Sequence, residues 1–172
     1  MRDILTAAAR AIELCRVAGL RIVTAESCTG GLISGALTEI PGSSAVLDRG
    51  FVTYSNRAKV EMLGVPPELI EAKGAVSEEV ARAMAAGALA NSSADIVVSV
   101  TGVAGPGGGT PSKPVGLVYI AVQRRGQDAM TLENRFPPDA SRETIRGLSV
   151  YAALRLVIEA VEGPEQPQSA PH

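Results

Sequence analysis

The run from Asp95 to Val100, with IVVSV at its centre, constrains the possible fold more than any other segment. A short, continuous apolar run rich in β-branched residues is typical of a strand that is buried on both faces. Such strands belong to parallel or mixed sheets that are covered by helices. We therefore expect an α/β domain, with a core of Ala, Val, Leu and Ile because aromatic residues make up only 3% of the chain.

Helical and strand patterns alternate on either side of this run. Gly19 stands where the C-cap glycine of a first amphipathic helix belongs, and Ser77 is the expected N-cap of an Ala-rich helix. The buried residues expected in the last helix include Ile145, Leu148, Ala152 and Val157. The expected helices cover residues 4–18, 32–40, 58–63, 78–90 and 139–161, and the expected strands cover residues 20–25, 51–54, 95–100, 115–122 and 130–136.

Length and composition indicate one globular domain, residues 1–162, followed by a disordered tail, residues 163–172, with the sequence GPEQPQSAPH. The formal net charge of −2 argues against a protein that binds nucleic acid through a basic face. Two cysteines are too few for a disulfide framework, and we find no signal peptide and no run long enough to span a membrane. We therefore expect a cytoplasmic protein.

The only histidine is His172, the last residue, in a segment with no reason to fold. This position argues against Ser-His-Asp catalysis and against metal sites built on histidine. In a hydrolase of this composition, the general base must be a lysine, a tyrosine or a carboxylate.

The segment TAESCTGG places Ser27 between a strand end and a helix start. An exposed hydroxyl there can meet a substrate, while Gly30 and Gly31 leave backbone N–H groups free to stabilise an anion. Two other interpretations stay open: Ser27 and Thr29 only cap the helix, or Cys28 is the nucleophile. Without a histidine to form a thiolate, Cys28 fits better as a small buried residue.

The segment FVTYSNRAK brings Tyr54 and Lys59 within five residues of each other across a turn. A lysine becomes a useful base when burial or a neighbouring cation lowers its pKa from about 10.4, and a tyrosine can relay the proton. The alternative is a solvated Lys59 and a half-buried Tyr54 without a catalytic role.

Two further features fit an anionic or nucleotide ligand. The loop TGVAGPGGGTPSKP, residues 101–114, follows the buried strand as ligand loops of open α/β sheets do, although it matches neither a Walker A sequence nor G-x-G-x-x-G. Arg142 and Arg146 lie one helical turn apart, which suits a phosphate monoester. A flexible surface loop and a solvated charged helix face are the alternatives.

Four ordered segments together resemble the C-terminal domain of the competence/damage-inducible CinA family, over about residues 4–161. They are TAESCTGG, IPGSSAVLDRGFVTYSNRAK, GAVSEEV and VTGVAGPGGGTPSKPVGLVYIAV. The resemblance implies a three-layer α/β/α sandwich with a mixed, largely parallel sheet. It also implies the activity of the family's stand-alone members, which hydrolyse the carboxamide of nicotinamide mononucleotide to nicotinate mononucleotide and ammonia.

Carried over by residue, the family's nucleophile falls on Ser27 and its assisting pair on Tyr54 and Lys59. The implied substrate pocket comprises Thr29, Gly30, Gly31, Asn56, Thr101, Gly102, Gly105, Arg142 and Arg146. We expect no metal or organic cofactor, no nucleic acid or membrane partner, and a homo-oligomer with a dimer favoured. The rival hypothesis is a non-catalytic nucleotide-binding module with a regulatory role in competence or the DNA-damage response.

Overall fold

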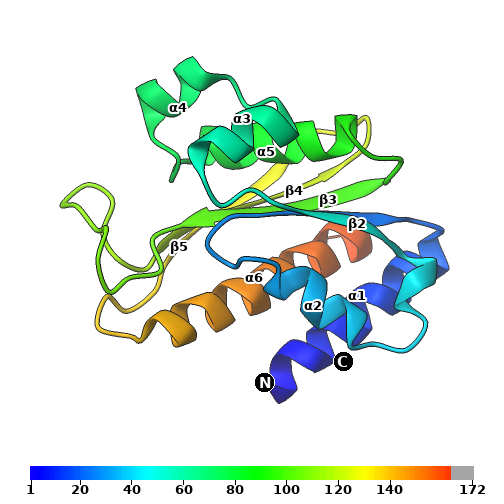
Figure 1. Ribbon diagram of the computed structural model, residues 1–172. Coiled ribbons are helices and arrows are strands. Elements are labelled where there is room, and N and C mark those ends of the chain that lie inside the picture. Colours follow the sequence, from blue (N-terminus) through cyan, green and yellow to red (C-terminus); the bar gives the residue numbers. More distant parts are fainter. Residues whose placement is uncertain (164–172) are drawn as a thin grey trace, which may run out of the picture.

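The computed structural model describes residues 1–163, which form three layers, a sheet between two groups of helices (Figure 1). The predicted tail, apart from Gly163, and His172 lie outside the described residues. The helices are α1 (Arg2–Ala18), α2 (Leu32–Thr38), α3 (Asn56–Leu63), α4 (Pro67–Lys73), α5 (Glu78–Ala90) and α6 (Arg142–Glu162), with a short 3-10 helix at Ser43–Ala45; the strands are β1 (Ile22–Glu26), β2 (Leu47–Val52), β3 (Ile96–Gly102), β4 (Leu117–Arg124) and β5 (Met130–Arg135).

The sheet has the strand order β2-β1-β3-β4-β5. Strands β2, β1 and β3 are parallel, β4 is antiparallel to β3, and β5 is antiparallel to β4. Four of the five strands of this sheet therefore run in one direction. Helices α1, α2 and α6 cover one face and α3, α4 and α5 the other (Figure 1). The predicted mixed three-layer sandwich is confirmed.

The central strands contribute side chains to both layers of the core. Ile96 and Val98 of β3 pack against the layer of α1, α2 and α6, whereas Val97 packs against α5 and its neighbours. All three side chains are fully buried. This alternation is why β3 is largely apolar, since neither face of the strand meets water, and its two buried hydroxyl groups, of Ser99 and Thr101, donate to the carbonyls of Ala81 and Ala75.

Helix ends follow the predicted capping residues. Gly19 ends α1 in the left-handed region with φ 68°, and Ser77 accepts a hydrogen bond from the amide of Val80 at the start of α5. The last helix begins at Arg142 rather than near Asp139, because Ser141 is the capping residue and accepts from the amide of Thr144.

Helix α4 (Pro67–Lys73) was not among the expected helices, and two further details differ from the sequence prediction. Strand β2 begins at Leu47, four residues before the predicted start at Phe51. Its first half, LDRG, is polar because β2 is an edge strand, held by main-chain pairing with β1 rather than by burial. Leu148 was expected to be buried but is 37% exposed, because Ser149 takes the inward position and donates to the carbonyl of Ile145.

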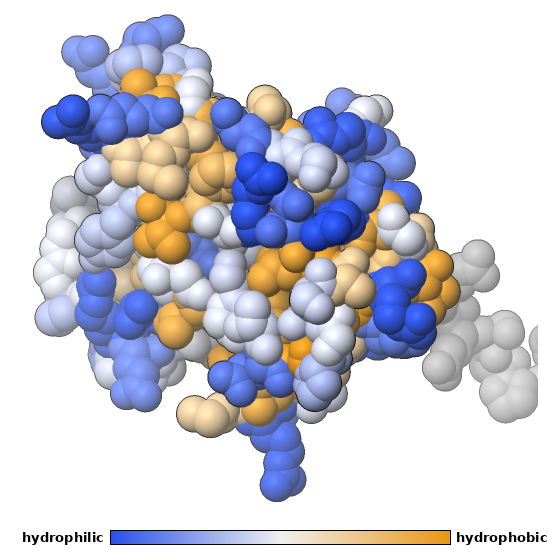
Figure 2. Space-filling view, turned by 45° about the vertical axis from the view of Figure 1, so that its right-hand side comes forward, coloured by the Kyte–Doolittle hydropathy of each residue, from blue (hydrophilic) through white to orange (hydrophobic). Residues whose placement is uncertain are grey.

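Large apolar side chains are exposed at scattered positions, among them Leu5, Met62 and Tyr151. On the face shown in Figure 2 they form separate patches between hydrophilic residues rather than one continuous surface. No helix within residues 1–163 has the length and the apolar composition needed to cross a membrane.

Gly87 lies where α5 packs on the end of α3, and replacing it tests how close this contact is. A Cβ atom at this position would overlap the carbonyl group of Leu63. We expect Gly87→Ala to lower the free energy of unfolding by about 1 to 3 kcal/mol, although alanine is the better helix former. The control is Gly147→Ala in α6, where nothing lies within 4 Å of the added Cβ, and which should raise stability by up to about 1 kcal/mol. Urea denaturation measures both, and a Gly87→Ala variant as stable as Gly147→Ala would contradict this packing.

Candidate active site

The parallel strands β1, β2 and β3 all end at the same edge of the sheet. The helix that follows β1, α2, packs on one face, whereas the helix that follows β2, α3, packs on the other. A crevice opens where consecutive connections leave on opposite sides, and open α/β sheets bind ligands there. Ser27 lies at this point, directly after β1.

A fully buried carboxylate shapes the turn that carries Ser27. Glu26 accepts hydrogen bonds from the amides of Gly31, Ile33 and Ser34, at 3.2, 2.9 and 3.0 Å. These three charge-assisted bonds offset the cost of burying the charge, and they place it at the positive end of α2. Gly30 and Gly31 have φ values of 61° and 103°, which glycine adopts most readily. The glycine pair therefore bends the chain tightly from β1 into α2.

Lys59 reaches Ser27 from α3, the helix on the opposite face of the sheet. Its Nζ donates to Ser27 Oγ at 2.9 Å and to the carbonyl oxygen of Thr53, also at 2.9 Å. The lysine is only 1% exposed, and this burial lowers its pKa, with Cys28 acting weakly in the opposite direction. A buried amine is more readily neutral, and a neutral amine can accept the proton of the Ser27 hydroxyl.

Tyr54 lies at the opening of the same site and is 62% exposed. Its hydroxyl accepts a hydrogen bond from Arg142 at 2.9 Å, and Arg142 also donates to the carbonyl of Gly105 at 2.7 Å. We expected Tyr54 and Lys59 to converge on one point. They line one cavity, but the Tyr54 hydroxyl is bonded to Arg142, whereas the Lys59 amine is bonded to Ser27.

These residues surround a cavity of about 530 Å³. Its wall includes eight of the residues that the sequence indicated: Ser27, Tyr54, Asn56, Lys59, Thr101, Gly102, Gly105 and Arg142. The volume is within the range of roughly 300 to 1,000 Å³ of small-molecule sites. Five segments far apart in the sequence thus meet at one end of the sheet.

The other four predicted residues do not line the cavity. Thr29 is fully buried in the turn, and the amides of Gly30 and Gly31 donate to the Ser27 carbonyl and to Glu26. The expectation that Gly30 supplies an N–H group to an anion is therefore not met. Arg146 donates to the carbonyls of Cys28 and Thr29, at 3.1 and 3.3 Å, and so contacts the protein where we expected it to contact a phosphate.

Cys28 does not fit a nucleophile in this structure. Burial raises the pKa of its thiol to about 11, which leaves the thiolate scarce at neutral pH. The interpretation of Cys28 as a small buried residue agrees with its position in the core beneath α2.

Three contributions to the site escaped the sequence analysis. The buried Glu26 stands next to Ser27, the Thr53 carbonyl accepts from Lys59, and the segment Ala75–Val76 forms one wall of the cavity. Lys113, from the Gly-rich loop, donates to the carbonyls of Lys73 and Val76 and so holds the loop against that wall. Backbone acceptors leave no sequence signal, but an acidic residue directly before a candidate nucleophile does.

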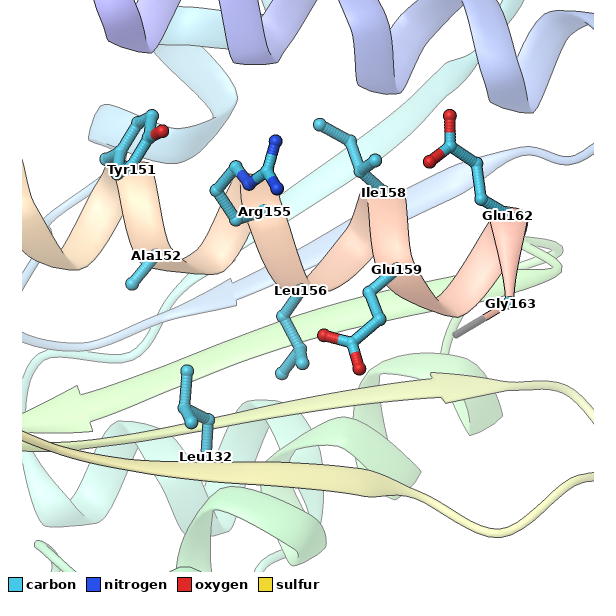
Figure 3. A pocket seen from close by; sticks show the side chains of 9 residues that line it. All are labelled: Leu132, Tyr151, Ala152, Arg155, Leu156, Ile158, Glu159, Glu162 and Gly163. Carbon is cyan, nitrogen blue, oxygen red and sulfur yellow. The ribbon is translucent and has the colours of Figure 1, made fainter. Parts of the chain in front are cut away.

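A second cavity, of about 500 Å³, lies between β5 and α6 (Figure 3). Leu132 of β5 and Leu156 of α6 point toward one another across it, and Arg155 projects from another side of the helix (Figure 3). It shares no residue with the Ser27 cavity, and its lining contains no serine, threonine, cysteine or lysine. The chemistry described above is therefore confined to the cavity around Ser27.

Comparison with known proteins gives a consistent result. The family model of the CinA C-terminal domain matches residues 5–161. A CinA-like protein of Mycolicibacterium vanbaalenii is 52% identical over 147 residues, and one of Akkermansia muciniphila is 50% identical over 141 residues. These alignments cover 86% and 82% of this chain but only 34% of each relative. The chain thus spans about a third of the length of the curated relatives it matches.

Solved structures match the fold over nearly the whole chain. The competence/damage inducible protein CihA from Agrobacterium tumefaciens has a TM-score of 0.89 and 52% identity, with 93% of this chain and 96% of that chain covered. A CinA superfamily protein from Klebsiella pneumoniae has a TM-score of 0.88 and 34% identity, with coverage of 92% and 98%.

The lowered pKa of Lys59 makes stability depend on pH. The folded protein releases this proton at a lower pH than the unfolded chain, whose lysine titrates near 10.5. Between these two values the unfolded chain binds more protons, so stability rises with pH until both states are neutral. We expect the free energy of unfolding of the wild type to rise relative to Lys59→Met from pH 7 to pH 10, by at most about 1.4 kcal/mol per pH unit. Urea titrations of both proteins at several pH values measure it, and a constant difference would contradict the burial effect.

Proposed function

Because this chain belongs to the CinA C-terminal domain family, we propose that it is an amidohydrolase that converts nicotinamide mononucleotide to nicotinate mononucleotide and ammonia. The observation that carries the proposal is the 2.9 Å contact between the buried Lys59 amine and the Ser27 hydroxyl, inside a cavity of ligand size. The resemblance supplies the substrate, and the geometry supplies a nucleophile and a base for acyl transfer.

In the proposed first step, Ser27 Oγ attacks the carboxamide carbon as neutral Lys59 takes the hydroxyl proton. The tetrahedral intermediate then collapses, the C–N bond breaks, and the Lys59 ammonium returns its proton to the leaving nitrogen, which departs as ammonia. Water attacks the resulting acyl-enzyme with Lys59 again as the base. Nicotinate mononucleotide leaves, and the proton goes back to Ser27 Oγ. A single buried amine can serve both half-reactions because it is restored after each.

The negative oxygen of the intermediate requires hydrogen-bond donors. Within residues 27–31, the amides of Ser27, Gly30 and Gly31 are occupied by Val100, Ser27 and Glu26. Within residues 1–163, the amides of Cys28 and Thr29 donate to no other residue. Of the two residues, only Cys28 lines the cavity, whereas Thr29 is fully buried. We therefore assign the anion-stabilising role to the Cys28 amide in place of Gly30. The amide directly after the nucleophile has this role in other strand-turn-helix hydrolase sites.

Arg142 is the proposed contact for the phosphate group. It is exposed, it lines the cavity, and its guanidinium lies between Tyr54 and the Gly-rich loop at Gly105. Binding energy from this remote, non-reacting group holds the carboxamide close to Ser27. In this arrangement Tyr54 orients Arg142, and Lys59 alone exchanges the proton with Ser27.

Replacing the nucleophile tests the proposal most directly. We expect Ser27→Ala to reduce ammonia release from nicotinamide mononucleotide by at least roughly 10³-fold while the protein still binds the nucleotide. Ser93→Ala, an exposed serine outside the cavity, is the matched control and should retain full activity. Ammonia and nicotinate mononucleotide are measured in parallel. Activity in Ser27→Ala would refute the nucleophile assignment, and binding without ammonia release by the wild type would favour a non-catalytic binding module.

Replacing Arg142 tests phosphate recognition. We expect Arg142→Met to raise KM for nicotinamide mononucleotide roughly 10- to 100-fold with a smaller change in kcat, because each hydrogen bond to a charged group contributes about 1.5 to 3 kcal/mol. Nicotinamide riboside, which lacks the phosphate, is the matched comparison, and the variant should process it as the wild type does. Equal losses on both compounds would show that Arg142 does not act on the phosphate.

A further inference from the structure

We propose that Arg146 is a positioning residue for the nucleophile rather than a ligand for the substrate phosphate. This inference rests on the proposed role of Ser27 and assigns Arg146 a function in that same site. It starts from the two carbonyl groups that the guanidinium holds, those of Cys28 and Thr29, which directly follow Ser27.

Two opposite charges hold the turn, and each binds the backbone groups of matching polarity. Glu26 accepts from amides at the end of the turn and in the first residues of α2. Arg146 donates to carbonyls in the middle of the turn. The carboxylate is part of β1, whereas the guanidinium comes from α6, more than a hundred residues later in the sequence. The orientation of the turn thus depends on α6 as well as on the local chain.

Arg146 is attached to a firmly packed part of α6. Its neighbour Ile145 and the next inward residue, Ser149, are both fully buried against the sheet layer. A guanidinium anchored in this way can fix the peptide groups it binds, because its donors form a rigid fork. Arg142, one turn earlier, is exposed and lines the cavity. Two arginines that look equivalent in the sequence therefore have different surroundings.

The geometry of the peptide group connects the hydrogen bonds of Arg146 to the proposed reaction. In a trans peptide the C=O and N–H groups point in opposite directions, so holding the Cys28 carbonyl toward Arg146 turns the Thr29 amide away from it. The carbonyl held by Arg146 belongs to Cys28, and the amide of the same residue is the donor assigned to the intermediate. Gly30 fits the same arrangement, because a Cβ there would lie 3.3 Å from the Arg146 guanidinium. The guanidinium thus sets the direction of the Cys28–Thr29 peptide group and helps to fix the residue that directly follows the nucleophile.

The test compares three arginines of α6 replaced by methionine. Arg146→Met should lower kcat for nicotinamide mononucleotide roughly 10- to 100-fold and leave KM within about twofold, since an interaction that acts in the transition state changes kcat. Arg142→Met should do the reverse. Arg155→Met, beside the second cavity in Figure 3, is the control and should leave both constants unchanged. A rise in KM without a fall in kcat for Arg146→Met, or no change in either constant, would overturn the inference.

A second measurement separates this inference from the choice of substrate. A fluorophosphonate probe reacts with an activated serine whatever the natural substrate is, and intact-mass analysis gives its rate of reaction with Ser27. We expect Arg146→Met to slow this labelling at least tenfold and Arg155→Met to leave it unchanged, even if the wild type releases no ammonia from nicotinamide mononucleotide. A wild-type Ser27 that is never labelled would overturn the inference, because no reactive hydroxyl would then exist to be positioned.

Arg146→Lys is the control that shows whether a folding defect causes the slower labelling of Arg146→Met. It keeps the positive charge but lacks the fork that reaches two carbonyls, so its labelling rate should fall between those of the wild type and Arg146→Met. Urea midpoints are measured for every variant. Slow labelling that follows lost stability, with Arg146→Lys equal to the wild type in both, would show that Arg146 stabilises the fold and does not position Ser27.

Discussion

The contact between the Lys59 amine and the Ser27 hydroxyl is the constraint on which the rest of the site depends. A lysine amine in water is protonated at neutral pH and cannot accept a proton, whereas burial by the surrounding layers lowers the pKa of Lys59. Burial in turn requires polar partners, and the lysine finds them in Ser27 and the Thr53 carbonyl. The same burial that costs stability therefore creates the reactivity, and the sheet must be rigid enough to sustain both.

The turn after β1 has to present the Ser27 hydroxyl and a free amide next to it at a tight bend. The amides of Ser27, Gly30 and Gly31 are occupied by the carbonyl of Val100, the carbonyl of Ser27 and the carboxylate of Glu26. Arg146 occupies the carbonyls on the other side. Because the two charges hold complementary backbone groups, the bend that Gly30 and Gly31 permit is fixed from both sides of the chain.

In the proposed reaction, substrate recognition and chemistry take place at different ends of the cavity. Ser27 and Lys59 lie at its buried end, whereas Tyr54 and Arg142 lie at its exposed opening. Lys113 holds the Gly-rich loop to the segment before α5, which completes the wall between these ends. The two solved structures described above share this fold at 52% and 34% identity, and the chain covers about a third of the longer curated relatives. The cavity is built within that third.

The sequence by itself determined the layered fold and the membership of Ser27, Tyr54, Lys59 and the Gly-rich loop in one site. Hydrophobic periodicity, capping residues and continuous apolar runs are local properties that the sequence displays directly. Parallel strands end at the same edge of the sheet, so the motifs that follow them meet there. Sequence spacing could not determine which partner each side chain takes. It treated Arg142 and Arg146 as a pair, paired Tyr54 with Lys59, gave Gly30 a free amide, and missed Glu26. Those outcomes depend on the distances between α2, α3 and α6 across the sheet. Only tertiary packing sets such distances, because a long polar side chain bonds to whichever buried group lies within reach.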